Sequence, residues 1–193
     1  MRPAPLHKST IITIAGRPGS GKSTTAKMVA DALGYDHFSS GDLFREMVHK
    51  LGFDLTAGSL HAEQNSEIDV AVDQRLREMG EESTDIVIDS RMAWHWMPNS
   101  FRVYLELDSK TAAERIMGAL DEKRRAVEHV PESIEEYAQQ LDERLASEAR
   151  RYSALYGVNP YVEDHYDIVI NTASSTPEES TQQIIKAYKA WLS

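Results

Sequence analysis

The residues 16–23 constrain this chain more than any other segment, because they read GRPGSGKS and match the pattern G-x-x-x-x-G-K-[ST]. The apolar, β-branched run before them, residues 10–15, predicts a buried strand, and residues 24–33 after them predict a helix that ends at Gly34. A strand, a glycine-rich turn and a helix N-terminus together form a cradle of backbone N–H groups for phosphate. Within that cradle Lys22 can reach the β- and γ-phosphates, and the Ser23 hydroxyl can ligate Mg²⁺. We therefore predict that a nucleotide is bound by Gly16, Arg17, Pro18, Gly19, Ser20, Gly21, Lys22, Ser23 and Thr24.

Length and composition limit the class of protein further. With 193 residues, 41% of them apolar, the chain can form one α/β domain over residues 1–193. A formal charge of −10 argues against binding nucleic acid or an anionic membrane surface, so an anionic ligand requires locally gathered cations. Such clusters occur at residues 123–125 (KRR) and at residues 150–151 (RR).

The chain has no cysteine, which excludes disulfides and thiolate metal sites and fits a cytoplasmic protein. No apolar run is long enough to span a membrane, and residues 1–8 lack the apolar core of a signal peptide and are expected to be disordered. The absence of a heptad pattern leads us to expect a monomer.

Apolar strand patterns alternate with helical ones along the chain. Strands are expected at residues 10–15, 35–39, 85–89, 101–107 and 167–171, with helices at 24–33, 43–51, 67–80, 109–120, 131–156 and from about 176 onward. Pro131 is expected in the first turn of the long helix, Ser66 is a candidate N-cap, and residues 53–65 are expected to be a loop. This alternation predicts a mostly parallel sheet with helices on both faces.

Charged residues follow two of the predicted strands. Asp89 ends the apolar run 85–89, where a carboxylate can hold Mg²⁺ beside the phosphate loop; the alternative is a solvent-facing strand end. Arg91 follows it, and Arg45 lies on the helix opened by residues 40–42. Because guanidinium binds phosphate in a bidentate mode, the pair suggests a second anionic group opposite the nucleotide, although either arginine alone could be a surface residue.

Two further pairs lie on predicted helices. Arg144 and Arg151 are seven residues apart, nearly two turns, so both project from one face and can span a polyphosphate; the alternative is pairing with acids of the same helix, such as Glu148. Asp69 and Asp73 are one turn apart and could accept hydrogen bonds from an amino group and a ribose, or be solvated. For the aromatic run 94–96, core packing is favoured over a base pocket, and the histidines show no metal-ligand spacing.

Taken in order, these motifs resemble those of the nucleoside-monophosphate kinases, and most closely the short, archaeal-type cytidylate kinases. The matching stretches are residues 12–24, 40–45 (SGDLFR), 67–75, 87–91 (VIDSR), 143–157 and 167–172 (DIVINT). They cover nearly the whole chain. Two departures lie beside Arg91: Ser90 stands where the family usually has glycine, and residues 92–97 match only approximately.

The resemblance implies a P-loop NTPase fold, a three-layer α/β sandwich with a five-stranded parallel sheet, an insertion that binds the nucleoside monophosphate at about residues 40–80 and a lid at about 120–131. It implies ATP and Mg²⁺ as cofactors and small nucleotides as substrates. Carried over by position, the catalytic residues are Lys22, Arg144 and Arg151, the metal is held by Ser23 and Asp89, and the monophosphate is bound by Ser40, Asp42, Arg45, Asp69, Asp73 and Arg91.

The expected reaction is transfer of a phosphoryl group from ATP to CMP or dCMP. The choice among CMP, dCMP, UMP and other monophosphates stays open at this point. Two alternative functions also stay open. One is a P-loop kinase of a small hydroxyl-bearing metabolite, for which Asp42 is the candidate base, and the other is an ATP-binding module without catalysis.

Overall fold

The computed structural model describes residues 9–52, 67–120 and 130–193. The expected disordered lead, the loop at 53–65, the cap at Ser66 and the cationic cluster at 123–125 therefore lie outside the described residues, as does most of the expected lid.

Five strands form one sheet, all of them parallel. They are β1 (Ile11–Gly16), β2 (Asp36–Ser39), β3 (Ile86–Asp89), β4 (Phe101–Glu106) and β5 (Ile168–Asn171), in the spatial order β2-β3-β1-β4-β5. In register, Asp89 lies opposite both Ile14 of β1 and Ser39 of β2. Because parallel strands end at the same edge, the carboxyl ends of β2, β3 and β1 bring their following loops together there.

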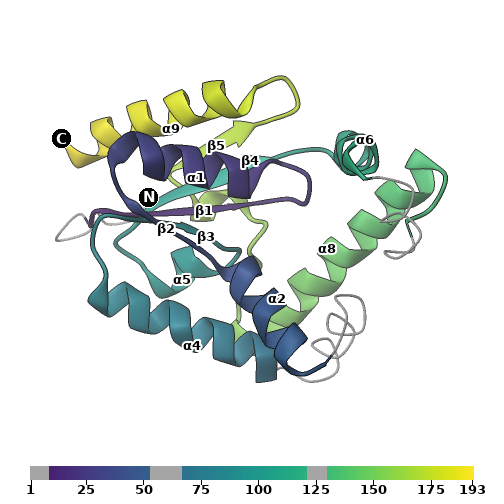
Figure 1. The fold of residues 1–193 in the computed structure, drawn as a ribbon, viewed down its shortest axis with the longest axis horizontal. Helices are drawn as coiled ribbons and strands as arrows, with labels where there is room; N and C mark the ends of the chain where they lie inside the picture. The colour runs from purple at the N-terminus through teal and green to yellow at the C-terminus, as the bar shows by residue number, and fades with distance from the viewer. Residues whose placement is uncertain (1–8, 53–66, 121–129) are drawn as a thin grey trace.

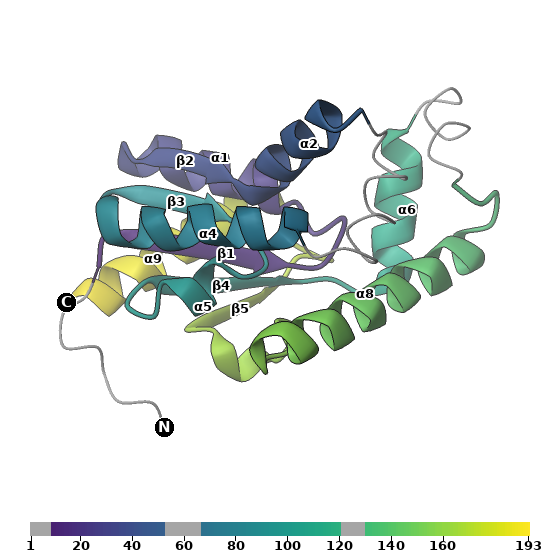
Figure 2. The same cartoon turned by 90° about the horizontal axis from the view of Figure 1, so that it is seen from below.

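Helices cover both faces of this sheet, which gives the expected three layers (Figure 1). On one face lie α1 (Lys22–Leu33) and α9 (Pro177–Leu192), and on the other lie α4 (Glu67–Glu82) and the short α5 (Ala93–Trp96). The other helices are α2 (Ser40–Lys50), α6 (Ser109–Ala119), α8 (Ile134–Tyr156) and the 3₁₀ turn η1 (Glu163–His165). α8 packs against α6 and lies beyond the carboxyl ends of the strands (Figure 1 and Figure 2).

Alternation along β1 explains the two apolar layers. Ile12 and Ile14 pack with α1 and α9, together with Ile184 and Tyr188, whereas Ile11 belongs to the layer under α2, α4 and α5. A strand covered on both faces needs apolar side chains on both, so the uninterrupted apolar run of β1 follows from its central place in the sheet.

The long helix α8 begins three residues later than expected. The Ser133 side chain accepts a hydrogen bond from the backbone N–H of Glu136 and caps the helix, so Pro131 lies outside it. The expectation for Pro131 was therefore wrong, because a serine cap supplies an acceptor that proline lacks. In the same way Ser39 caps α2, which consequently begins at Ser40 and not at residue 43.

Candidate functional site

The loop between β1 and α1 depends on glycine at two positions of close approach. A Cβ on Gly16, whose φ is +154°, would lie 2.3 Å from the carbonyl oxygen of Leu105 in the neighbouring strand β4. A Cβ on Gly19, at φ +72°, would lie 3.1 Å from the Cα of Ala112 in α6. Both conformations are ones that side-chain-bearing residues rarely adopt. The two glycines therefore let the loop lie flat against β4 and α6.

Lys22 is the first residue of α1 and is half-buried at the base of this loop. Its ammonium group donates to the carbonyl oxygen of Arg17 at 3.0 Å, and the Ser20 hydroxyl donates to the same oxygen at 2.8 Å. Burial, and then the charge of Arg91, lower the pKa of Lys22 to about 8. A phosphate group bound here would oppose that shift, because it adds negative charge beside the ammonium.

Ser23 and Asp89 meet across the edge of the sheet. The Ser23 hydroxyl donates to Oδ2 of Asp89 at 2.5 Å, and Asp89 is buried at the end of β3. A hydroxyl and a carboxylate are ligands that suit Mg²⁺, which takes few protein ligands and completes its shell with water and phosphate oxygens. Among the described residues no cluster of three or more acids, histidines or cysteines could hold a metal by itself.

A cavity of about 610 Å³ opens in front of Lys22, Ser23 and Asp89. Its walls come from the ends of β2 and β3 and from α1, α2, α4 and α8. Ten of the residues singled out in the sequence line it: Lys22, Ser23, Ser40, Arg45, Asp69, Asp73, Asp89, Arg91, Arg144 and Arg151. The fold thus gathers five cationic side chains from four elements around one space.

Among the residues predicted to bind the monophosphate, Asp42 is the one that does not line this cavity; of the residues predicted to bind ATP, Lys22 and Ser23 line it. Its side chain is 72% exposed and forms an ion pair with Arg45, three residues along the same helix. A general base must lie within hydrogen-bonding reach of the proton that it removes. The structure therefore offers no support for Asp42 as the base of a hydroxyl-phosphorylating enzyme.

Two of the arginines share one buried carboxylate, that of Glu148 on α8. Arg91 Nε lies 2.8 Å from Glu148 Oε2, Arg144 Nε lies 3.1 Å from Oε1, and the Tyr161 hydroxyl donates to Oε2. Although burial opposes ionisation, the two arginines lower the pKa of Glu148 to about 2. The intrahelical alternative for Arg144 is thus correct, yet the same side chain also lines the cavity.

The two aspartates of α4 are buried and not solvated. Asp69 Oδ2 lies 3.1 Å from Nε of Arg151, so this arginine pairs with another element and not within α8. Burial raises the pKa of Asp69, and Arg151 opposes that shift. Burial also raises the pKa of Asp73, while the Tyr156 hydroxyl and the Trp96 indole beside its carboxylate oppose it. Two acceptors therefore line the cavity at its α4 wall.

The aromatic run after β3 contributes to packing. Trp94 is buried and stacks on His165 with ring centroids 4.3 Å apart, and Trp96 carries the Arg77 guanidinium 3.8 Å from its ring centroid. The favoured expectation of core packing is confirmed for Trp94. Sequence reasoning missed Tyr161 altogether, because no local pattern links it to an arginine 70 positions earlier in the chain.

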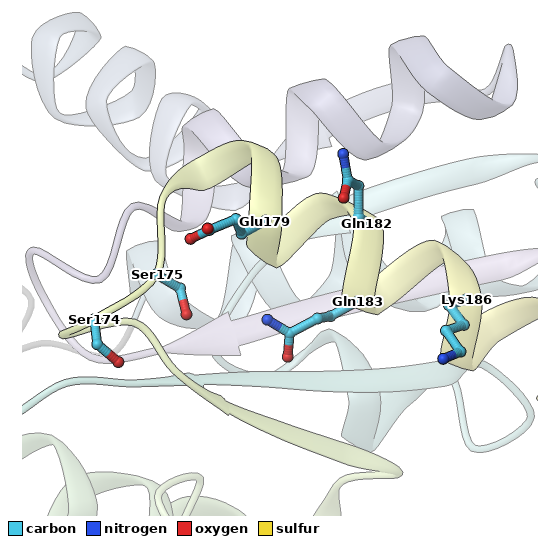
Figure 3. A pocket seen from close by; sticks show the side chains of 6 residues that line it. All are labelled: Ser174, Ser175, Glu179, Gln182, Gln183 and Lys186. Carbon is cyan, nitrogen blue, oxygen red and sulfur yellow. The ribbon is translucent and has the colours of Figure 1, made fainter.

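A second, shallower hollow lies on the far side of the loop after β5. Figure 3 shows two serines of that loop and four polar side chains of α9 around it: Ser174, Ser175, Glu179, Gln182, Gln183 and Lys186. None of the predicted site residues lines it. The candidate site is therefore the cavity in front of the phosphate loop.

Comparison with known proteins identifies the family. The family model described as the cytidylate kinase-like family matches residues 11–174. The chain belongs to the cytidylate kinase-like family. Among curated members, the cytidylate kinase of Methanopyrus kandleri is 34% identical over 190 residues, covering 93% of this chain and 92% of its own. That of Thermoplasma volcanium is 36% identical over 172 residues, covering 87% of this chain and 85% of its own.

Solved structures agree on the fold. A shikimate kinase from Bacteroides thetaiotaomicron superposes with a TM-score of 0.64 at 14% identity, covering 93% of this chain and 98% of that one. An uncharacterised protein from Eubacterium ventriosum superposes with a TM-score of 0.62 at 20% identity, covering 94% of this chain and 99% of that one. At these identities the likeness shows the P-loop kinase fold of this cytidylate kinase-like chain and nothing about its acceptor.

Proposed function

We propose that this protein transfers the γ-phosphoryl group of ATP reversibly to CMP or dCMP, with Mg²⁺ as the metal. The observation that carries the proposal is one shared cavity, in which the phosphate-loop lysine faces the arginines of α2, of the loop after β3 and of α8. Family membership adds the acceptor class, since the curated relatives are cytidylate kinases. The relatives do not favour a hydroxyl acceptor or a non-catalytic ATP-binding role.

The chemistry requires little acid–base help from the protein. The second pKa of a phosphate monoester is about 6, so the acceptor's phosphate is already a nucleophile at neutral pH. The protein must instead align two mutually repelling anions and offset the charge of the transferring group. We assign Arg45 and Arg91 to the acceptor's phosphate, and Lys22, Arg144 and Arg151 to the transferring phosphoryl group.

The loop from Gly16 to Thr24 would hold the phosphates of ATP through backbone N–H groups and Lys22. When bound, Mg²⁺ supplies positive charge to those phosphates, and Ser23 and Asp89 would hold it there. The fit rests on the hydroxyl–carboxylate pair at 2.5 Å, directly beside the first turn of α1.

The α4 wall of the cavity suits cytosine better than uracil. The exocyclic amino group of cytosine donates hydrogen bonds, whereas uracil has a carbonyl oxygen at the same position. Asp69 and Asp73 present carboxylates, which accept hydrogen bonds when ionised and repel a carbonyl oxygen. Ser40 and Arg45 line the same cavity from α2. We assign recognition of the base and the sugar to Asp69 and Asp73 of the α4 wall.

We further propose that the chain is a single kinase domain in which residues 40–80 form the acceptor-binding insertion and residues 120–131 the lid. In support, α2 and α4 supply Ser40, Arg45, Asp69 and Asp73 to the cavity. We also expect a monomer that acts in the cytoplasm, in line with the lack of cysteine. No helix in the described part of the chain is both long and apolar enough to cross a bilayer.

The test is a coupled assay of ADP release with Mg-ATP and AMP, CMP, dCMP, UMP or GMP, with a reaction lacking acceptor as background. We expect selective turnover of CMP or dCMP, its loss in Lys22→Ala, and a higher KM for the monophosphate in Arg45→Ala. Preference for another monophosphate would contradict the assignment of the base, and background rates with every acceptor would contradict the reaction itself.

A further inference from the structure

The Glu148 carboxylate has no role in the reaction described so far, yet three side chains pair with it. Its side chain is 8% exposed and meets two arginines, one at the end of β3 and one on its own helix. The Tyr161 hydroxyl donates to the same carboxylate and lies beside Arg91. Glu148 therefore joins three segments that are distant in sequence: the end of β3, α8 and the loop before η1.

Burial of a carboxylate is unfavourable unless other groups compensate for its lost hydration. A carboxylate removed from water loses several kcal/mol of hydration, which only close cations and hydrogen bonds can offset. Conversely, without Glu148 the charges of Arg91 and Arg144 would repel each other and the ammonium of Lys22, whose pKa both already lower. The three cations can share one cavity because this carboxylate lies among them.

The contact geometry leaves both arginines able to bind phosphate. Each guanidinium meets the Glu148 carboxylate through Nε. A guanidinium carries five N–H donors in a rigid plane, so pairing through Nε does not require the terminal nitrogens. Arg144 Nε donates a hydrogen bond to Oε1, whereas Arg91 Nε is held by an ion pair without hydrogen-bond geometry. Both arginines line the cavity. Glu148 is thus placed to set the direction in which their terminal nitrogens point.

We propose that Glu148, itself oriented by Tyr161, is a positioning residue that holds Arg91 and Arg144 in fixed relation for phosphoryl transfer. The inference rests on the proposed function, in which Arg91 contacts the acceptor's phosphate and Arg144 the transferring group. Glu148 gives up no proton and touches no reacting atom in this account. Its effect passes entirely through the two guanidinium groups.

A different role for the same contacts would have the opposite consequence. If Glu148 occupied the arginines in place of a phosphate, it would compete with CMP, and its removal would tighten CMP binding. If it positions the arginines, its removal weakens CMP binding, because misplaced donors bind the phosphate poorly. The sign of the change distinguishes the two roles.

The test compares Glu148→Gln, which keeps the volume and removes the charge, with Glu148→Asp, which keeps the charge on a shorter stem. Glu143→Gln is the matched control, since Glu143 is an exposed glutamate of the same helix that accepts a hydrogen bond from Gln139. Measured quantities are the Kd of CMP, the Kd of the ATP analogue AMP-PNP, kcat and the melting temperature.

For Glu148→Gln we expect kcat/KM for CMP to fall about 100-fold, the loss typical of catalytic groups misplaced by about 1 Å. Its Kd for CMP should rise by a larger factor than its Kd for AMP-PNP, because the intact phosphate loop still holds AMP-PNP and, of the two arginines that pair with Glu148, only Arg144 is assigned to the γ-phosphoryl group. Glu148→Asp should recover part of the loss, and Glu143→Gln should behave as the wild type.

Tyr161→Phe removes only the hydroxyl that donates to Glu148, and it tests the positioning role with a smaller change. We expect a smaller loss of kcat/KM than in Glu148→Gln, and little additional loss when the two changes are combined, because both act through one carboxylate. Should Glu148→Gln fail to fold, Tyr161→Phe and Glu148→Asp carry the test.

Three results for Glu148→Gln would overturn the inference. The first is unchanged kinetics in the folded variant, and the second is tighter binding of CMP. The third is an equal loss of CMP and AMP-PNP binding together with a lowered melting temperature, which would indicate a structural role alone. Failure of the wild type to phosphorylate any monophosphate would overturn the proposed function, and this inference with it. Normal wild-type turnover together with any of the three results would overturn only the inference.

Discussion

Binding of ATP should draw a proton onto Lys22. In the protein without nucleotide, burial and the neighbouring Arg91 hold the pKa of this ammonium at about 8, against an ordinary value of 10.5. A group whose pKa equals the pH is half protonated, so at pH 8 about half of the molecules carry a neutral lysine. Triphosphate oxygens beside the nitrogen favour the charged form and restore it.

The expected magnitude follows from these values. At pH 8, binding should take up about 0.5 proton per nucleotide, and at pH 7 only about 0.1, because the free site is then already nine-tenths protonated. Isothermal titration calorimetry with AMP-PNP in two buffers of different ionisation enthalpy, such as Tris and HEPES, measures this number directly.

Lys22→Arg supplies the control, since its guanidinium stays charged at any pH reached by the experiment. It should show no uptake attributable to residue 22, so the difference from the wild type isolates the lysine. Equal proton uptake in the wild type and in Lys22→Arg at pH 8 would refute the reasoning, because it would mean that Lys22 is fully charged before the nucleotide arrives.

Three further predictions concern stability and specificity. Gly16→Ala should lower the free energy of unfolding by about 1–3 kcal/mol through backbone strain, since the added Cβ would lie 2.3 Å from a carbonyl oxygen. Gly118→Ala in α6, where an added Cβ meets nothing within 4 Å, should raise it by about 0.5–1 kcal/mol. Urea unfolding of both variants measures these changes. Folding lowers the pKa of Glu148 from its ordinary 4.5 to about 2, so the unfolded chain binds more protons than the folded one between these values. The wild type should therefore lose stability as the pH falls from 4.5 to about 2, and the melting temperature of Glu148→Gln should fall less over the same range. An equal fall of the melting temperature in both proteins would contradict the pairing of Glu148 with the arginines. Asp73→Asn should narrow the ratio of kcat/KM between CMP and UMP, because an amide can donate to the uracil carbonyl; an unchanged ratio would remove Asp73 from base recognition.

The parts of the structure that follow from local pattern were predictable from the sequence. The strand before the phosphate loop, the helix after it and the carboxylate ending β3 each show a short-range signal, and the structure has all three, with the helix beginning two residues earlier than expected, at Lys22. The start of α8 at Ile134 follows from Ser133 with Glu136 three residues later, a pattern typical of a helix N-terminus, and not from Pro131.

The pairings between distant segments could not be predicted in this way. Arg91 and Glu148 are 57 positions apart, and only the placement of α8, which packs against α6, brings them within 2.8 Å. Arg151 had equally plausible acidic neighbours on its own helix, yet it pairs with Asp69 on α4. A sequence pattern states which charges exist, while the choice of partner depends on the three-dimensional arrangement of the helices.

The position of Trp96 gives this protein an optical signal of its own. Its indole lies beside the Asp73 carboxylate and 5.0 Å, centroid to centroid, from the ring of Tyr156, whereas Trp94 stacks on His165 and Trp191 packs on Phe101. A base arriving at Asp73 changes the surroundings of one tryptophan out of three. Titration of the unlabelled protein with CMP should therefore shift its intrinsic fluorescence, and Trp96→Phe should abolish that shift.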